Sequence, residues 1–199
     1  MPRIVLASRN KGKLKELKML LSDLRWEVCS LLDYSGVPEV EEDGVTFIEN
    51  AIKKATTVAR YLNEWTVADD SGLEVDALKG APGVRSARFA GVQGDDQANN
   101  EKLLQMLTAV AWEKRTARFR SALAFASPEG EVWTTEGWCE GVISFEPRGE
   151  GGFGYDPLFY LPELELTMAE LSDEEKNKIS HRAMAMKNFR AYLKDASGA

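Results

Sequence analysis

The chain has 199 residues, with 25 Lys and Arg against 32 Asp and Glu, so its formal net charge is −7. This acidic balance disfavours a general nucleic-acid binder, because affinity for such polymers comes mostly from basic side chains on phosphates. The hydrophobic fraction of 44% and the charged fraction of 29% are typical of a globular protein and exclude a disordered one. No apolar stretch is long enough to span a membrane, and the first residues predict a strand rather than a signal peptide.

The first third of the chain predicts two strands that alternate with two helices. The leucines from Leu14 to Leu24 recur at three- and four-residue spacing, which is typical of an amphipathic helix. Thr46 and Glu49 have the spacing of a capping box, which satisfies free backbone amides at a helix start. The four expected elements are strand 4–7, helix 14–24, strand 26–31 and helix 46–62.

The rest of the chain changes in character. An apolar run over 66–68 predicts a strand that ends at Asp69 and Asp70, and the alternation over 73–77 predicts an extension of the sheet. Two strand-like runs surround Pro128-Glu129-Gly130, which indicates a β-hairpin. The other expected elements are loop 80–94, helix 99–110, strands 118–126 and 131–139, a capping box at Ser172 and Glu175, and helix 182–194.

These elements predict an α/β fold with a mixed central sheet, helices on its faces and two lobes. Because no linker, repeat or low-complexity segment interrupts the chain, we expect residues 1–199 to form a single domain. Cys29 and Cys139 lie far apart without a CxxC motif, which favours two reduced thiols in a cytoplasmic protein. The single histidine, His181, excludes a site that needs several imidazoles.

A basic turn between the first strand and the first helix is the first candidate site. Backbone N–H groups and the positive end of the helix dipole meet at such a junction, which suits phosphate. Ser8, Asn10 and Lys13 supply side-chain donors, although a solvated lysine-rich helix face is the alternative. The GK[ST] ending of a Walker A loop is absent. The turn consists of Ser8, Arg9, Asn10, Lys11, Gly12 and Lys13.

Acidic residues form the second candidate site. Asp69 and Asp70 follow an apolar strand, and ligands of open α/β sheets collect beyond the carboxyl ends of strands. Adjacent carboxylates repel unless a cation lies between them, and Mg²⁺ is typically held by one or two carboxylates plus substrate phosphates. The acidic loop at Glu39, Glu41, Glu42 and Asp43 also contributes, although solvation alone accounts well for Glu42 and Asp43.

Two further candidates lie near the end of the chain. Residues 149–154 match GxGxxG, but we reject a dinucleotide fingerprint because the segment follows Pro147-Arg148 and does not open a helix. Phe153 could stack on a nucleobase or fill the core. Lys176, His181 and Arg182 could donate to an anion or a keto oxygen at a helix start, with a surface cap as the alternative for His181.

Six stretches in order resemble the family of non-standard purine nucleoside triphosphate pyrophosphatases, also known as XTP/dITP diphosphatases, inosine triphosphate pyrophosphatases or HAM1-like proteins. The resemblance covers essentially the whole chain. It implies a two-lobed α/β fold with a deep cleft, usually homodimeric, and Mg²⁺-dependent hydrolysis of ITP, dITP and XTP to a monophosphate and pyrophosphate. The stretches are LASRNKGK at 6–13, TFIENA at 46–51, ADDSGL at 68–73, GAPG at 80–83, GGFGYDP at 151–157 and SHR at 180–182.

The resemblance also implies roles for individual residues. Residues 8–13 would hold phosphates, Glu41 and Asp70 would bind the metal, and Ser71 would touch the substrate. Asp70 is the proton acceptor that the family implies, but Asp69 stays open as an alternative, because a tight metal ligand is a poor free base. The base would be surrounded by Phe153, Gly154, Tyr155, Asp156, Lys176, His181 and Arg182.

Donors facing the 6-keto group, from main-chain N–H groups, Lys176, His181 or Arg182, would favour hypoxanthine and xanthine over adenine. Rejection of GTP requires discrimination at position 2. Two other functions are weighed against hydrolysis. A non-catalytic nucleotide- or RNA-binding module would bind without turnover, but paired carboxylates serve no purpose in it. A nicotinamide-dependent dehydrogenase depends on the GxGxxG match alone.

Overall fold

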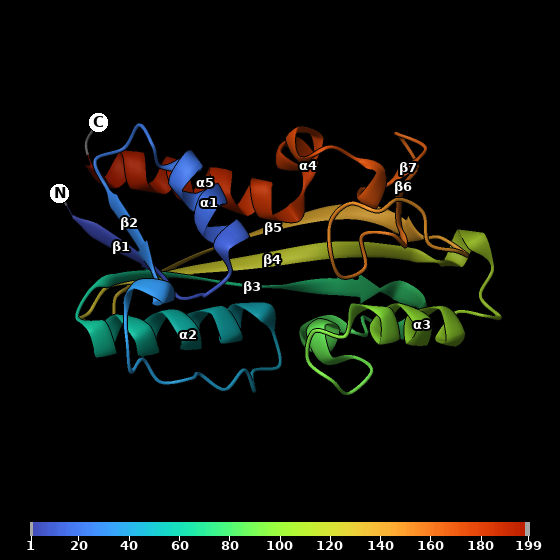
Figure 1. Cartoon of the computed structure of the whole chain (residues 1–199), viewed down its shortest axis with the longest axis horizontal. Helices are drawn as coiled ribbons and strands as arrows, with labels where there is room; N and C mark the ends of the chain where they lie inside the picture. The colour runs from blue at the N-terminus through green and yellow to red at the C-terminus, as the bar shows by residue number, and fades with distance from the viewer. Residues whose placement is uncertain (1, 198–199) are drawn as a thin grey trace. The chain divides into compact units, whose positions relative to one another are not determined.

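The computed structural model describes residues 2–197 and divides the chain into two compact units. Unit 1 comprises the residues up to Asp70, Ser121–Glu136 and the residues from Met184 onward, and unit 2 comprises Ser71–Arg120 and Gly137–Ala183. Seven strands form a sheet in the order β2-β1-β3-β4-β5-β6-β7 (Figure 1). Since β1 pairs in parallel with β2 and β3 while β6 pairs antiparallel with β5 and β7, the expected mixed α/β sheet is confirmed.

Unit 1 packs helices on both faces of its strands (Figure 1). Side chains of β1 alternate between the two faces, because successive residues of a strand point in opposite directions. Ile4 and Leu6 pack with α1 and α5, whereas Val5 packs with Val58 of α2. The elements are β1 (Arg3–Leu6), α1 (Lys11–Leu20), β2 (Glu27–Ser30), η1 (Leu31–Asp33), α2 (Phe47–Leu62) and most of α5 (His181–Ser197).

Three long strands contribute to both units, namely β3 (Trp65–Val75), β4 (Thr116–Ala126) and β5 (Val132–Ile143). Unit 2 has its own core, in which Leu103 and Leu107 of the α3 region pack with Phe119 and Phe159. Its remaining elements are η2 (Asp76–Leu78), η3 (Gly83–Arg88), α3 (Asp96–Met106), η4 (Trp112–Lys114), β6 (Phe159–Leu161), β7 (Leu166–Thr167), η5 (Met168–Glu170) and α4 (Asp173–Ile179). In the part of the chain that the structure describes, no helix could cross a membrane.

The expected end of a strand at Asp69 and Asp70 is wrong, because both residues lie inside β3. The parallel pairing with β1 nevertheless stops just before them, at the register pair Leu6 and Val67. The two aspartates therefore follow the carboxyl end of β1, while β3 continues into unit 2. The short strands β6 and β7 were not expected from the sequence.

Helix caps follow the predictions in part. Ser172 and Glu175 form the expected capping box of α4. At α2 the hydroxyl of Thr46 accepts from the N–H of Glu49, as expected, but the Glu49 carboxylate accepts from the N–H of Val45 over 2.8 Å instead of closing the box on Thr46. The start of α4 therefore has a complete capping box. The start of α2 has only the Thr46 cap, because the Glu49 carboxylate binds the N–H of Val45 instead.

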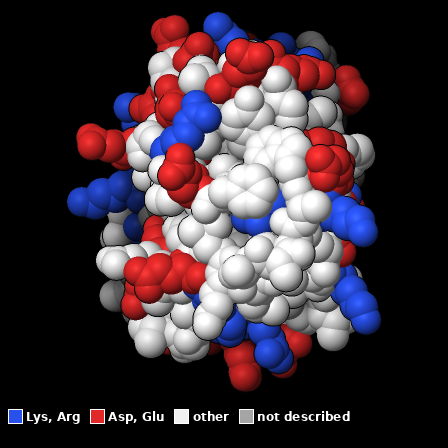
Figure 2. All heavy atoms as spheres, turned by 90° about the vertical axis from the view of Figure 1, so that its right-hand side faces the viewer, with Lys and Arg blue, Asp and Glu red and all other residues white. Residues whose placement is uncertain are grey.

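One end of unit 2 presents uncharged side chains surrounded by charged ones (Figure 2). Beneath exposed Phe145, the guanidinium of Arg115 lies 4.4 Å from the ring centre. Arg115 is 1% exposed and donates to the carbonyls of Ile143, Leu107 and Ser144 over 2.7 to 2.9 Å. A buried cation therefore joins the ends of β5 and α3 through backbone oxygens.

Candidate functional site

The basic turn of unit 1 begins where β1 ends. Oγ of Ser8 accepts from the N–H of Asn10 over 3.1 Å, and Oδ1 of Asn10 caps α1 by accepting from the N–H of Lys13 over 3.1 Å. The first turn of α1 contains no acidic residue, so the positive end of its dipole is not neutralised by its own helix. Arg9 and Lys11 are exposed. This geometry suits an anion.

Asp69 is buried, and side chains from two other elements contact both of its carboxylate oxygens. Ser121 of β4 donates to Oδ1 over 2.8 Å. Lys13 of α1 forms an ion pair with Oδ2, and its side chain is only 20% exposed. The predicted phosphate-binding lysine and the predicted acid therefore lie together in the folded protein.

Asp70 is also buried and faces α2. Nδ2 of Asn50 donates to Oδ2 of Asp70 over 3.0 Å, and Nζ of Lys54 lies 3.6 Å from Oδ1. The pKa of Asp70 is raised to about 6, chiefly by burial and also by the charges of Glu42 and Asp69, against the opposing effects of Lys54 and Asn50. The pKa of a carboxylate in this position would fall if a cation approached it.

Lys54 connects the acidic loop to the strand that carries the aspartates. Its Nζ donates to the backbone carbonyl of Asp69 over 2.8 Å and to Oε1 of Glu42 over 3.1 Å. Glu42 is therefore the loop acid that the structure links to Asp70, whereas Glu41, the ligand implied by resemblance, is exposed.

The acidic residues fit a magnesium ion that phosphate oxygens would complete. The Oδ1 atom of Asp70 is a hard oxygen donor whose nearest cation, Lys54, stands beyond hydrogen-bond distance. Within residues 2–197 no three metal-ligating side chains form a ready cage. Magnesium is commonly held by one or two carboxylates plus substrate phosphates, so such a cage is not required.

The glycine-rich segment of unit 2 bends and turns into β6 without opening a helix, which agrees with the rejection of a dinucleotide fingerprint. Lys176 of α4 donates to Oδ2 of Asp156 over 3.3 Å, and the N–H of Phe153 donates to the same oxygen over 3.3 Å. Burial raises the pKa of Asp156, and Lys176 opposes the shift. A Cβ at Gly152 would lie 2.0 Å from this oxygen, so the loop requires glycine there.

Two residues of α3 hold the next peptide of the segment. Oδ2 of Asp96 accepts from the N–H of Gly154 over 2.7 Å, and Nδ2 of Asn100 donates to the Gly154 carbonyl over 2.8 Å. The side chain of Tyr155 is buried, and its hydroxyl donates to the carbonyl of Ser86. Tyr155 can therefore meet a ligand through its backbone but not through its ring.

Phe153 is the exposed aromatic residue of this segment, with 64% of its surface accessible. The guanidinium of Arg182 lies 5.7 Å from the centre of its ring. His181 stacks on Phe119, with ring centres 5.0 Å apart. Unit 2 thus brings Phe153, Asp156, Lys176 and Arg182 into one connected group through the contacts described, and Ser71, half-buried in β3, belongs to the same unit.

The model of the Ham1 family matches residues 4–192. The chain belongs to the Ham1 family. A curated relative from Desulforamulus reducens, named dITP/XTP pyrophosphatase, is 60% identical over 185 residues, which cover 93% of this chain and 92% of the relative. The family match over residues 4–192 includes segments of both units.

Solved structures agree with the Ham1 assignment. A HAM1 protein from Coxiella burnetii superposes with a TM-score of 0.93 at 43% identity, covering 98% of this chain and 100% of the other. A structure from Mycobacterium abscessus, described as a nucleoside-triphosphatase or dITP/XTP pyrophosphatase, has a TM-score of 0.82 at 45% identity and covers 94% of this chain and 98% of the other.

Sequence reasoning missed three residues of this Ham1-family site, namely Asn50, Lys54 and Ser121. Asn50 and Lys54 lie four residues apart, so they share one face of α2. The other buried residues of α2, namely Phe47, Ala51, Ala55, Val58 and Ala59, are apolar, so the polar Asn50 beside them was the available signal. No comparable signal marks Ser121, because its approach to Asp69 depends on the pairing of distant strands.

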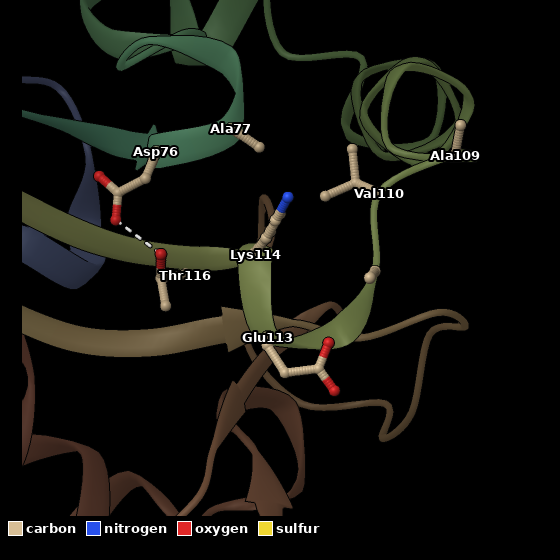
Figure 3. A pocket seen from close by; sticks show the side chains of 8 residues that line it. Asp76, Ala77, Ala109, Val110, Glu113, Lys114 and Thr116 are labelled. Carbon is tan, nitrogen blue, oxygen red and sulfur yellow. Dashed lines mark hydrogen bonds between the residues drawn. The ribbon is translucent and has the colours of Figure 1, made fainter.

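A pocket of about 610 Å³ also lies in unit 2 (Figure 3). Its lining includes Asp76, which accepts from the hydroxyl of Thr116 over 2.7 Å. None of the residues expected to act in this Ham1-family chain lines the pocket. The chemistry points instead to the groups around Asp70 and Asp156.

Proposed function

We propose that this chain hydrolyses non-standard purine nucleoside triphosphates, namely dITP, ITP and XTP, to the nucleoside monophosphate and pyrophosphate, and so removes deaminated purines from the nucleotide pool. The names of the relatives from Desulforamulus reducens and Mycobacterium abscessus support the substrate class. The observation that carries the chemistry is the gathering of Lys13, Lys54, Asp69 and Asp70 next to the basic turn.

The phosphate chemistry is assigned to unit 1. Donors of the basic turn and the ammonium of Lys13 would bind triphosphate oxygens, which reduces the repulsion that a negatively charged phosphate presents to a nucleophile. Magnesium, held by Asp70 and by Glu41 or Glu42, would supply charge neutralisation at the phosphoryl oxygens. Lys54 keeps Glu42 and Asp70 from repelling each other before the cation binds.

Of the two aspartates, Asp70 is the better candidate to act on water, and its proposed place as a metal ligand favours orienting the water over abstracting its proton as a free base. Ser121 and Lys13 contact both oxygens of Asp69. In Asp70, Oδ2 accepts from Nδ2 of Asn50, while Oδ1 stands 3.6 Å from Nζ of Lys54. A group that orients water needs an oxygen within hydrogen-bond reach of it, and we assign this role to Oδ1 of Asp70. Asp69 then serves to hold Lys13.

Recognition of the base is assigned to unit 2. Three backbone N–H groups of the glycine-rich segment, those of Phe153, Gly154 and Asp156, already have acceptors. We therefore assign the 6-keto group to side-chain donors of Lys176, His181 and Arg182, with Phe153 as the stacking ring. An adenine amino group would place donor against donor there, at a cost of about 1–3 kcal/mol for each unpaired group.

The deciding experiment is a nucleotide panel scored for both products. Purified protein with Mg²⁺ should release pyrophosphate, and no orthophosphate, from dITP, ITP and XTP, and it should act slowly on dATP and dGTP. Orthophosphate release would contradict the proposal. Tight binding of dITP without turnover would favour the non-catalytic binding module instead.

The cell compartment and the assembly state are also proposals, supported by the family resemblance. We propose a cytoplasmic homodimer that acts on free nucleotides and binds neither nucleic acid nor membrane. Light scattering after size-exclusion chromatography should give twice the chain mass of 22.1 kDa. A monomer mass would refute the dimer and leave the proposed chemistry unchanged.

A further inference from the structure

The side chain of Asn50 joins Asp70 to the acidic loop. Its Nδ2 donates to Oδ2 of Asp70 over 3.0 Å, and its Oδ1 accepts from the backbone N–H of Gly44 over 2.8 Å. Asn50 is fully buried. The two bonds define the orientation of the amide, because exchanging its nitrogen and oxygen would face acceptor with acceptor and donor with donor.

The backbone of Gly44 packs closely against the side chain of Asn50. A Cβ at Gly44 would lie 2.6 Å from Oδ1 of Asn50, so the loop backbone approaches the amide as closely as a glycine allows. Asn50 itself sits in the first turns of α2, whose start is capped by Thr46. The helix is therefore a rigid base from which a single side chain reaches both the loop and the strand.

Each of the two aspartates has one neutral donor and one charged partner. Asp69 has neutral Ser121 and charged Lys13, and Asp70 has neutral Asn50 and charged Lys54. A triphosphate attracts the two lysines strongly, whereas it exerts no comparable pull on an amide or a hydroxyl. The neutral donors are thus the contacts that can persist unchanged when substrate binds.

We propose that Asn50 is a positioning residue that holds Asp70 by Oδ2, keeps Oδ1 directed at the reacting phosphate and its metal, and fixes the acidic loop at Gly44. The inference rests on the proposed function, in which Asp70 acts on water and metal. Asn50 does not itself touch the substrate in this proposal. Its effect is on the orientation of a carboxylate and on the spacing between that carboxylate and the loop.

Three substitutions test the link from different sides. Asn50→Ala removes both hydrogen bonds. Asn50→Asp keeps an acceptor for Gly44 but replaces the donor to Asp70 with a like charge. Gly44→Ala leaves Asn50 intact and pushes it away from the loop, so this variant remains informative if a change at the buried Asn50 prevents folding.

Asn99 provides the matched control. It is 2% exposed, and like Asn50 it bridges two partners, because its Oδ1 accepts from the N–H of Ala90 and its Nδ2 donates to the carbonyl of Ala87. Asn99→Ala should lower thermal stability by loss of a buried amide while the folded protein keeps its kcat. The comparison separates a general packing cost from an effect on Asp70.

The measurements are kcat and KM for dITP with saturating Mg²⁺, and Mn²⁺ binding by electron paramagnetic resonance without nucleotide. All three variants should lower kcat about 10- to 100-fold with little change in KM, and Asn50→Ala and Gly44→Ala should weaken Mn²⁺ binding about tenfold. Folded variants with kcat within about twofold of wild type would overturn the inference. If wild type itself releases no pyrophosphate, the proposed function fails, and Mn²⁺ binding unaffected by Asn50→Ala would separately refute the link.

Discussion

Lys176 and Asp156 form an ion pair of 3.3 Å in which both side chains are mostly buried, with 15% and 12% of their surfaces exposed. The pair exists because Gly152 leaves room for it. A Cβ at that position would lie 2.5 Å from Nζ of Lys176 and even closer to the Asp156 carboxylate. The glycine-rich segment therefore owes part of its composition to a charged pair beneath it.

Gly152→Ala should displace this pair and weaken substrate binding. We expect KM for dITP to rise about tenfold or more, because a buried charged group loses its partner, while kcat changes less. The variant also carries a backbone penalty, since Gly152 has φ of +83°. Gly94→Ala is the control, because Gly94 has φ of +77° with open space around it, and it should leave KM unchanged.

Phe153→Ala tests the stacking role. Because the ring is 64% exposed, its removal should leave the melting temperature nearly unchanged. Loss of base stacking, worth about 1–3 kcal/mol, should raise KM for dITP about tenfold or more. Phe145, which is 59% exposed and contacts Arg115, supplies the control, since Phe145→Ala should keep the KM of wild type. Equal effects of the two substitutions would argue against stacking at Phe153.

Asp70→Asn should abolish turnover and yet stabilise the metal-free protein at alkaline pH. Burial raises the pKa of Asp70 from 3.8 to about 6, so the folded protein holds this proton more tightly than the unfolded chain. The stability contributed by protonation is complete below pH 3.8 and is lost as pH rises through 6. At pH 8 the substitution should therefore increase the free energy of unfolding by on the order of 3 kcal/mol, and the gain should shrink below pH 6.

Asp76→Asn should change the stability of the folded protein in the opposite direction. Hydrogen bonds from Thr116 and Arg118 lower the pKa of Asp76, so its ionised form stabilises the folded state above pH 4 or so and the contribution is lost as pH falls. In EDTA at pH 8, Asp70→Asn should melt above wild type and Asp76→Asn below it. The first difference should shrink below pH 6 and the second only below pH 3.8. Kinetics at saturating Mg²⁺ should show a loss of about 100-fold or more for Asp70→Asn.

Arg115→Met should destabilise unit 2 without changing kcat. The substitution leaves the carbonyls of Ile143, Leu107 and Ser144 without their buried donor. The expected cost is about 3 kcal/mol or more in urea unfolding. Arg25→Met, at an exposed position, should cost little. The folded Arg115 variant should keep wild-type kcat, and a parallel loss of kcat would contradict the separation of this residue from the site.

The helices could be predicted because each has a local signal. The leucine spacing indicated α1, although the expected range 14–24 lies three to four residues C-terminal to the observed Lys11–Leu20. In α5, Met186, Phe189 and Leu193 recur at three- and four-residue spacing and are buried. The continuation of β3 past Asp69 and Asp70 could not be predicted from the sequence, because two adjacent acids normally end a buried strand. They continue it here only because lysines and neutral donors from distant segments compensate them.

The candidate site, like the fold, could be predicted from the sequence only where local motifs mark its residues. The basic turn, the aspartate pair and the residues around Asp156 stand in local motifs, so the sequence pointed to them directly. Asn50, Lys54 and the hydroxyl of Ser121 act through contacts across 15 to 52 residues of chain, which no local spacing encodes. The exposed position of Glu41 and the pairing of Glu42 likewise depend on the tertiary path of the acidic loop.

The division of the chain into two units has a consequence for how the protein can be cut or recombined. The four boundaries at 70/71, 120/121, 136/137 and 183/184 fall inside β3, β4, β5 and α5, and none falls in a connecting loop. Neither unit is a continuous stretch of gene, so no truncation yields one of them whole and no linker offers a protease a place to separate them. Exchange of one unit between relatives would therefore need cuts at all four positions.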